Sequence, residues 1–191
     1  MTGLIVAVAF AAGEACVGFS GRVVTVIDPG QVLAVSVGEP IAGSVSYPGG
    51  LADSQPESWY GVYLSHVPPA GLSATVGPYH SSAAQEVSIS VMDSPAMGDQ
   101  VMVGSAWVAS DLPGYTVELS IRYRDTSGGA IDSDELPNLA DPWPVRRLVI
   151  QGCISGDACT RPAWEIWADI EDAWPCAGGR FAGERKRGRA S

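Results

Sequence analysis

The chain has 191 residues, a length that suits one domain, and 46% of them are hydrophobic against 17% charged. Its 23 glycines and 14 prolines interrupt it too often for long helices and favour short strands joined by turns. The net charge of −10 disfavours sequence-independent binding to nucleic acid phosphates or anionic lipid. We therefore expect no nucleic acid partner.

An apolar run of nine residues, 4–12 (LIVAVAFAA), stands near the start of the chain. Its length and its small final residues are typical of the hydrophobic region of a secretory signal, and it is too short to span a bilayer. No basic residue precedes it, so a buried strand is the other interpretation. We favour the signal and expect residues 1–15 to form a signal peptide, with cleavage after Ala15 and no transmembrane segment.

Alternation of apolar and polar residues between turns recurs along the rest of the chain, which predicts antiparallel strands with one polar face. The stretch 86–92 alternates most cleanly, with Val87, Ile89 and Val91 on one face. The first such stretch places Val17, Phe19, Gly21, Val23, Thr25 and Ile27 on one face. The strands that we expect are 17–27, 32–37, 41–47, 58–65, 72–79, 86–92, 101–108, 115–123, 145–152 and 164–171.

The last of these stretches has the most informative pattern. Trp164, Ile166, Ala168 and Ile170 would face the core, and Glu165, Trp167, Asp169 and Glu171 would face outward. A helix is also compatible with these residue types, but Pro162 and Pro175 leave it little room, so we favour a strand. The only long irregular stretch is 125–144.

Together these patterns predict an all-β fold, an antiparallel β-sandwich that is jelly-roll-like and has about nine or ten strands. We expect one sandwich domain over residues 16–179. The last twelve residues, 180–191, hold five of the eleven basic side chains among glycines and are expected to form a disordered basic tail.

Four cysteines, Cys16, Cys153, Cys159 and Cys176, form an even set behind a signal-like start, which predicts two disulfides among three possible connectivities. We favour Cys153 with Cys159, which closes a short loop rich in turn formers. We also favour Cys16 with Cys176, which ties the first strand to the segment after the last. The spacings fit no zinc site. Lipid attachment at Cys16 is the alternative, and it would leave Cys176 unpaired.

Several short motifs in a fixed order carry a resemblance to a known group of proteins. They are 43–47 (GSVSY) after 37–40 (VGEP), then 60–63 (YGVY), 72–77 (LSATVG) and 132–137 (DSDELP). With this layout, over about residues 19–170, the chain resembles exported β-sandwich proteins of the PEP-CTERM type, which Gram-negative bacteria sort to their surface by exosortase. It departs from them at its end, where no Pro-Glu-Pro motif and no apolar run precede the basic cluster.

The resemblance implies a secreted, periplasmic or cell-surface protein with a surface or matrix role, and it assigns no catalytic residue. The histidines agree with this view. His66 and His80 each lie at the end of a predicted strand, and no Gly-x-Ser-x-Gly motif accompanies the neighbouring Ser65 or Ser81.

A hydrolase built on paired carboxylates is equally poorly supported. Glu165, Asp169 and Glu171 share a predicted strand face, but they lie about 13 to 20 Å apart in an extended chain, which is too far for a glycosidase pair. We therefore assign no catalytic residue and lean toward a protein that is not an enzyme.

Calcium is the metal that the sequence best accommodates. Asp125, Asp132, Asp134, Glu135 and Asp141 bring hard oxygen donors together among glycine and serine turns, as in calcium loops of extracellular modules. The spacing does not fit an EF-hand. No cofactor is required by the pattern, and calcium is the one candidate.

Aromatic side chains offer a second route to binding. Trp167, Trp59 and Tyr63 are candidates for stacking on sugar rings from an exposed sheet face. The expected function is that of a non-catalytic secreted or surface protein with an adhesive or structural role. The alternative is a carbohydrate-binding, or less readily a carbohydrate-processing, module that depends on calcium. The expected partners are a polysaccharide or another matrix protein.

Overall fold

The computed structural model describes residues 14–55, 57–84, 86–94, 96–131, 133, 135–154 and 161–176, and every regular element among them is a β-strand. The prediction of an all-β antiparallel protein with about ten strands is therefore confirmed. In chain order the strands are β1 (Glu14–Ile27), β2 (Pro40–Pro48), β3 (Tyr60–Ser65), β4 (Gly71–Val76), β5 (Tyr79–Ala84), β6 (Val87–Met92), β7 (Asp99–Ser110), β8 (Tyr115–Asp125), β9 (Val145–Ile154) and β10 (Trp164–Pro175).

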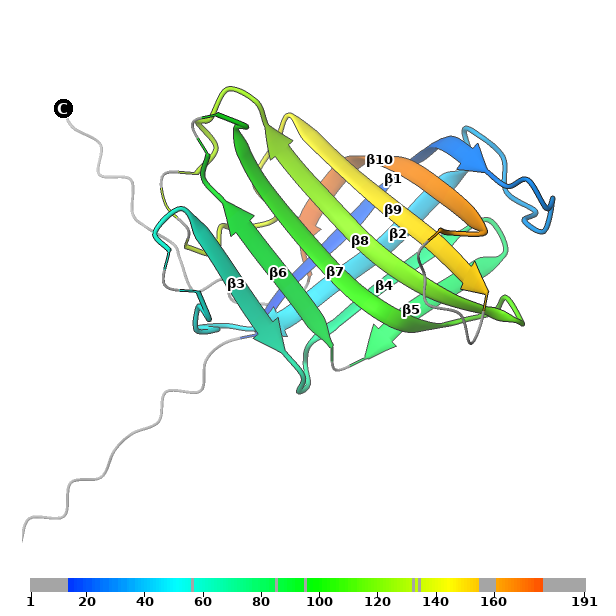
Figure 1. The fold of residues 1–191 in the computed structure, drawn as a ribbon, viewed down its shortest axis with the longest axis horizontal. Helices are drawn as coiled ribbons and strands as arrows, with labels where there is room; N and C mark the ends of the chain where they lie inside the picture. The colour runs from blue at the N-terminus through cyan, green and yellow to red at the C-terminus, as the bar shows by residue number, and fades with distance from the viewer. Residues whose placement is uncertain are drawn as a thin grey trace, which may run out of the picture.

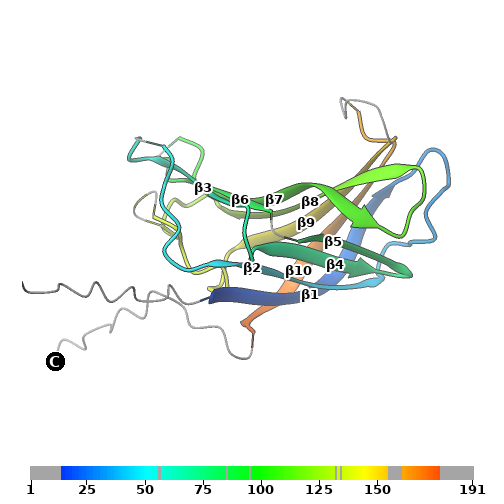
Figure 2. The same ribbon diagram turned by 90° about the horizontal axis from the view of Figure 1, so that it is seen from below.

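The ten strands form one curled antiparallel sheet in the order β3-β6-β7-β5-β4-β2-β1-β10-β9-β8 (Figure 1). The long strand β7 explains the curl. One of its edges pairs with β8, while the other pairs first with β6 and then, at Ala109 and Ser110, with β5. As a result, β3, β6 and β7 lie across the interior from β1 and β2 (Figure 2).

The apolar core fills the concave side of this sheet. On β10 the side chains of Trp164, Ile166, Ala168 and Ile170 are buried, with at most 5% of any of them exposed, which confirms both the strand and its predicted inward face. Burying one such side chain stabilises the fold by about 1.5 to 3 kcal/mol. The alternation of the sequence thus fixes which face of β10 meets solvent.

The inward face predicted for β1 is correct only for its first half. Val17, Phe19 and Val23 are buried, but Ile27 is 48% exposed. The pairing of β1 with β10 shifts register between Val23 and Thr25, and the shift turns the later side chains to the opposite face.

Residues 32–37 were predicted to be a strand, and this prediction is wrong. They form a loop between β1 and β2 whose backbone amides find side-chain acceptors instead of a neighbouring strand. The amide of Leu33 donates to Asp28, that of Ala34 to the Tyr79 hydroxyl and that of Ser36 to Glu39. Because these side chains accept the hydrogen bonds of the three amides, these amides do not need a neighbouring strand as a partner.

The stretch 72–79 is not one strand but two. A hairpin turn over Gly77 and Pro78 separates β4 from β5, and Val76 pairs with Tyr79 across it. Gly77 has φ of 51°, a left-handed conformation that other residues rarely adopt, so the turn depends on glycine. The sequence prediction missed β5, whose residues YHSSAA do not alternate.

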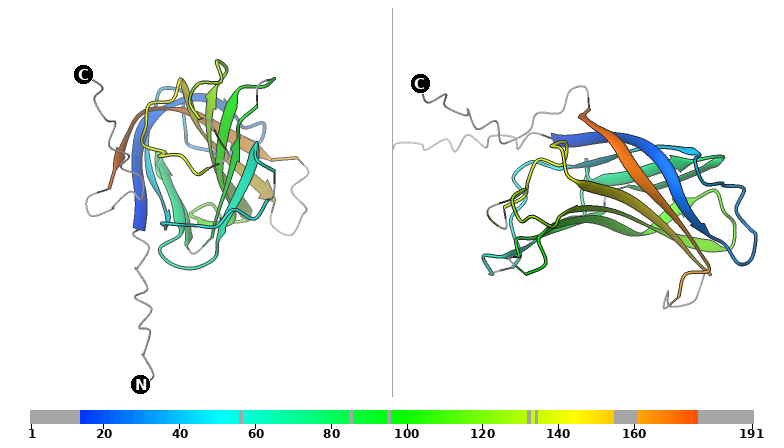
Figure 3. Two further views of the ribbon diagram at one scale, coloured as in Figure 1. Left: turned by 90° about the vertical axis from the view of Figure 1, so that its left-hand side faces the viewer. Right: turned by 90° about the horizontal axis from the view of Figure 1, so that it is seen from above.

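The first and last strands lie side by side, blue and orange in Figure 3, and pair from Val17 with Pro175 to Ile27 with Glu165. Of the predicted signal segment only Glu14 and Ala15 are described; they begin β1 and pair with Pro48 and Tyr47. The predicted basic tail lies outside the described residues. Within the described part of the chain, the structure contains no helix with the length and apolarity needed to cross a bilayer.

Candidate functional site

A disulfide joins the paired ends of β1 and β10. Cys16 and Cys176 have an S–S distance of 2.05 Å and lie 5.3 Å apart at Cα, which confirms the predicted pairing and rules out a lipid on the sulfur of Cys16 in this state. The amide of Cys176 also donates to the carbonyl of Cys16 at 3.0 Å. Cys153 is disulfide-bonded as well, and its expected partner, Cys159, lies outside the described residues.

The outward face of β10 carries a set of interlocked polar side chains. Arg147 on β9 pairs with Asp169, with its Nε and Nη2 both 2.9 Å from Asp169 Oδ1. The guanidinium carbon of Arg147 lies 5.7 Å from the centre of the Trp167 ring. On the other side, Trp167 Nε1 donates to Glu165 Oε2 at 2.8 Å. Trp167 therefore points outward as predicted, but it is half-buried and held in one orientation by its two neighbours.

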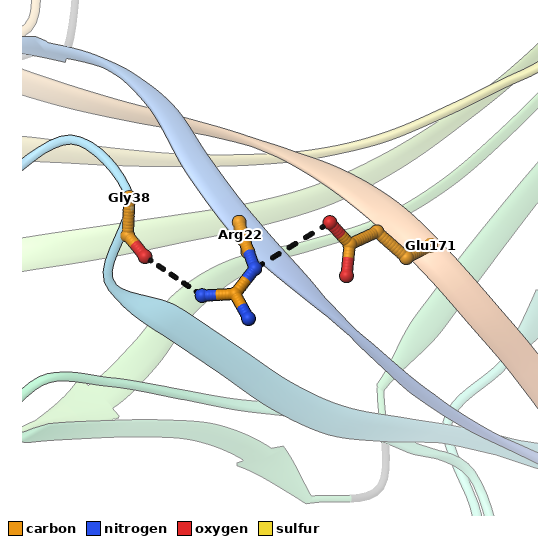
Figure 4. A network of polar contacts seen from close by, with 3 residues as sticks. All are labelled: Arg22, Gly38 and Glu171. Atoms are coloured by element: carbon orange, nitrogen blue, oxygen red, sulfur yellow. Dashed lines mark hydrogen bonds and ion pairs between the residues drawn. The ribbon is translucent and has the colours of Figure 1, made fainter.

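The third carboxylate predicted on this face, Glu171, is engaged by β1. Arg22 Nε lies 3.6 Å from Glu171 Oε1, and Arg22 Nη1 donates to the carbonyl of Gly38 at 3.2 Å (Figure 4). Both side chains are more than half exposed, so solvent screens the pair and its contribution to stability is small. The three carboxylates Glu165, Asp169 and Glu171 each have a different partner.

The three aromatic residues proposed for ligand binding do not lie together. Trp59 is 52% exposed and tilts against Tyr60 at the start of β3, with 5.9 Å between ring centres. Tyr63 on β3 is only 5% exposed and belongs to the core. Trp167 lies on β10, far along the sheet order from β3. Only Trp59 and Trp167 present ring surface to solvent, and they do so in separate places.

Another exposed aromatic, Trp174, is not among the three candidates for ligand binding. Its side chain is 45% exposed and covers Gly18, its cross-strand partner, where an added Cβ would lie 2.7 Å from the indole nitrogen. A tryptophan ring can lie over a glycine that faces it on the adjacent strand. The sequence alone does not show that Gly18 and Trp174 face each other, because this depends on the register of β1 against β10.

The predicted calcium ligands are only partly described. Asp132 and Asp134 lie outside the described residues, while Glu135 and Asp141 are exposed, and Asp141 accepts a hydrogen bond from Asn138 at 3.0 Å. Among the described residues, no group of three or more His, Cys, Asp or Glu side chains is placed to hold a metal ion.

Asp125, the remaining predicted ligand, has a partner that the sequence analysis missed. Asp99 opens β7, pairs with Asp125 at the end of β8, and is fully buried. Its Oδ2 accepts the amides of Ala130 and Ile131 at 2.8 and 3.0 Å, whereas its Oδ1 has no hydrogen-bond partner among the described residues. The loop after β8 thus folds back over two neighbouring carboxylates.

The side chain of Asp125 is anchored by the same loop. The hydroxyl and the amide of Ser127 donate to its Oδ1 at 2.7 and 2.8 Å, and the amide of Gly129 donates to Oδ2. These bonds, the hydroxyl first, lower the pKa of Asp125 below its ordinary value despite the opposing effect of burial. Asp125 is therefore ionised near neutral pH.

The two histidines lie near strand ends. His80 Nδ1 lies 3.1 Å from the hydroxyl of Thr75, and His66 is exposed after β3. The hydroxyl of Ser65 donates to the carbonyl of Val67 rather than to a histidine. These contacts match the interpretation of both residues as polar groups at strand ends.

Two buried tyrosines meet inside the curled sheet. Burial raises the pKa of Tyr47 on β2 to about 12. Burial also raises the pKa of Tyr123 on β8, and the charge of a Tyr47 phenolate raises it further, against a smaller opposing effect of Arg146. The Tyr123 ring packs against Trp143, with 5.7 Å between centres. Both phenols are therefore neutral core groups at neutral pH.

Comparison with known protein families, with curated proteins and with solved structures found no match to this chain. The resemblance to proteins of the PEP-CTERM type therefore stays a prediction.

Proposed function

We propose that this protein is a non-catalytic, secreted or surface-associated protein with an adhesive or structural role in an extracellular matrix. The observation that carries the proposal is the disulfide between Cys16 and Cys176. Disulfides form and persist mainly outside the cytoplasm, in the periplasm, at the cell surface or in secreted proteins. A bond that joins the first described strand to the last stabilises the fold, which suits a protein that works outside the cell.

The architecture that we propose is a flattened, jelly-roll-like β-sandwich, in which the two halves of the curled sheet enclose one core. The position of β3, β6 and β7 across the interior from β1 and β2 supports it (Figure 2). The loop 51–54 supports a soluble surface role, because it covers the free edge of β3. The amide of Val62 donates to Asp53, and its carbonyl accepts the amide of Ser54. Covered edges protect a sheet from pairing with other chains.

Thiol trapping in intact cells of a Gram-negative host tests the export on which the proposed function depends. Cells are treated with a membrane-permeant alkylating agent before lysis, fractions are separated, and the protein is analysed by mass spectrometry. We expect protein in the periplasm or medium with Cys16 and Cys176 unlabelled. Protein in the cytoplasm with both thiols alkylated would contradict the proposal.

A carbohydrate-binding module is the second candidate, and the set formed by Arg147, Trp167 and Glu165 favours it. An indole ring held in place by two neighbours loses little freedom on binding, and tryptophan rings stack on the apolar faces of sugars. Affinity electrophoresis in gels that contain single polysaccharides tests it. Wild type should be retarded by at least one of them and Trp167→Ala should not, with Trp59→Ala as the matched control at an exposed tryptophan elsewhere on the protein.

The calcium dependence proposed for this module centres on Asp99 and Asp125. Two adjacent carboxylates with a free buried oxygen, Asp99 Oδ1, suit a hard cation. Calcium takes roughly six to eight oxygen ligands, so a complete site needs further oxygens, which Asp132 and Asp134 are placed in the sequence to supply.

A further inference from the structure

The arginines of this acidic protein are concentrated on a few neighbouring strands. The described residues contain six arginines. Five of them lie on β8, β9 and β1, which are adjacent to one another or separated only by β10. These five are Arg22, Arg122, Arg124, Arg146 and Arg147; the sixth, Arg161, precedes β10. Acidic residues, in contrast, occur along the whole chain.

Three of these arginines share the outward face of the sheet beside Trp167. Arg122 on β8 stands directly opposite Arg147 on β9, and Arg147 stands opposite Asp169 on β10. Arg124 lies two residues beyond Arg122 on the same strand and face, about 7 Å away along the strand. We call Arg122, Arg124, Arg147 and Trp167 the arginine face.

The positive charge of this face is only partly balanced by the protein itself. Asp169 neutralises Arg147. Arg122 and Arg124 are exposed, and neither takes part in an ion pair with any described residue. Arg122 and Arg124 therefore hold the unbalanced positive charge of this face, and a bound anion would balance it.

We propose that the arginine face binds an acidic polysaccharide, with carboxylate or sulfate groups on Arg122 and Arg124 and a sugar ring against Trp167. This inference rests on the carbohydrate-binding candidate above and specifies its ligand class. Guanidinium groups bind carboxylate and sulfate oxygens in a two-pronged geometry, and exposed guanidiniums are free to do so.

The negative charge of the rest of the protein does not prevent such binding. At physiological ionic strength, charges are screened over about 8 Å, so the local field of the arginines dominates at this face. A nucleic acid is a poorer fit, because its charge is denser, one per about 1.7 Å of duplex. The two arginines without an ion-pair partner, Arg122 and Arg124, balance a short stretch of a polyuronate but only a small part of the field of a duplex.

The test is biolayer interferometry on immobilised polygalacturonate, with dextran as the neutral probe, run once with millimolar calcium and once with a chelator that excludes bridging by calcium. Wild type should bind polygalacturonate and not dextran, and its affinity should fall about tenfold or more as salt rises from about 50 to about 300 mM. The variant Arg122→Gln/Arg124→Gln should lose about tenfold or more in affinity. Arg161→Gln, which removes an exposed arginine elsewhere, should bind like wild type. Near-ultraviolet circular dichroism confirms that each variant is folded.

Equal binding by wild type and the double variant would overturn the inference. Binding of neutral glycans through Trp167 with no preference for polygalacturonate would overturn it while leaving the carbohydrate-binding function intact, whereas failure to bind any glycan would overturn both. Sedimentation velocity tests whether a second copy of the chain binds to the arginine face instead. Concentration-dependent self-association that the double variant abolishes, without polygalacturonate binding, would mean that the face meets a second copy of the chain.

Discussion

Removing the disulfide between Cys16 and Cys176, by Cys16→Ser with Cys176→Ser, should cost a large part of the stability of the fold. The two cysteines are separated by 160 residues in the sequence. Without the crosslink, the unfolded chain gains conformational entropy, and for a loop of this length the free energy of unfolding falls by about 5 kcal/mol. Domains are stable by only about 5 to 15 kcal/mol. For a domain of this size the melting temperature should fall by about 10 to 20 °C.

The folded structure itself should change little. β1 and β10 remain paired from Val17 with Pro175 onward, so the two serines stay adjacent and near-ultraviolet circular dichroism should match wild type. Guanidinium unfolding followed by tryptophan fluorescence measures the loss. The slope of the free energy against denaturant should rise, because the uncrosslinked unfolded chain exposes more surface.

The matched control removes the other predicted disulfide by Cys153→Ser with Cys159→Ser. That loop is short, and the same relation gives a loss of about 2 kcal/mol. The reasoning would be refuted if the first double variant lost less than about 1 kcal/mol, or if the two double variants lost equal amounts.

Three further predictions concern the core and the carboxylate pair. The pKa of Tyr47 is about 12 in the folded protein and about 10 in the unfolded chain, so the folded state holds the phenol proton more tightly. The free energy of unfolding should therefore fall by about 3 kcal/mol as pH rises from 10 to 12. Denaturant titrations across this range should show a fall smaller by that amount in Tyr47→Phe. Millimolar calcium should raise the melting temperature of wild type but not of Asp99→Asn, and an unshifted wild type in calorimetry would argue against the cation site. Gly152→Ala should cost about 1 to 3 kcal/mol in chemical denaturation, because its Cβ would lie 1.9 Å from the buried Trp164 ring; the control Gly104→Ala, whose nearest neighbour is 3.8 Å away, should cost less than about 1 kcal/mol.

The strands that could be predicted from the sequence are those whose buried side chains alternate without interruption. β6 and β10 belong to this class, and their faces are as expected. The prediction failed for 32–37, where side chains rather than a neighbouring strand bind the backbone amides. The Tyr79 hydroxyl, for example, accepts the amide of Ala34 and helps to hold 32–37 as a loop. The shift at Val23 was equally invisible, because a bulge changes the facing of side chains without changing the sequence pattern.

The candidate site was predicted in its chemistry but not in its pairings. The link between Cys16 and Cys176, favoured among three connectivities because it ties the first strand to the segment after the last, is confirmed. In contrast, Asp99 was missed because only the register of β7 against β8 places it opposite Asp125. For the same reason the contact of Arg147 with the Trp167 ring, and the position of Arg122 on β8 opposite Arg147 on the adjacent β9, could not be predicted.

The most direct test of a non-catalytic protein that adheres to an extracellular matrix is a glycan array probed with the disulfide-intact protein, with and without calcium. The array should present neutral, uronate-containing and sulfated glycans in one experiment. We predict signals on the acidic glycans that high salt abolishes and that the substitutions at Arg122 and Arg124 remove. An array without signal on any glycan in either condition would contradict adhesion through a polysaccharide.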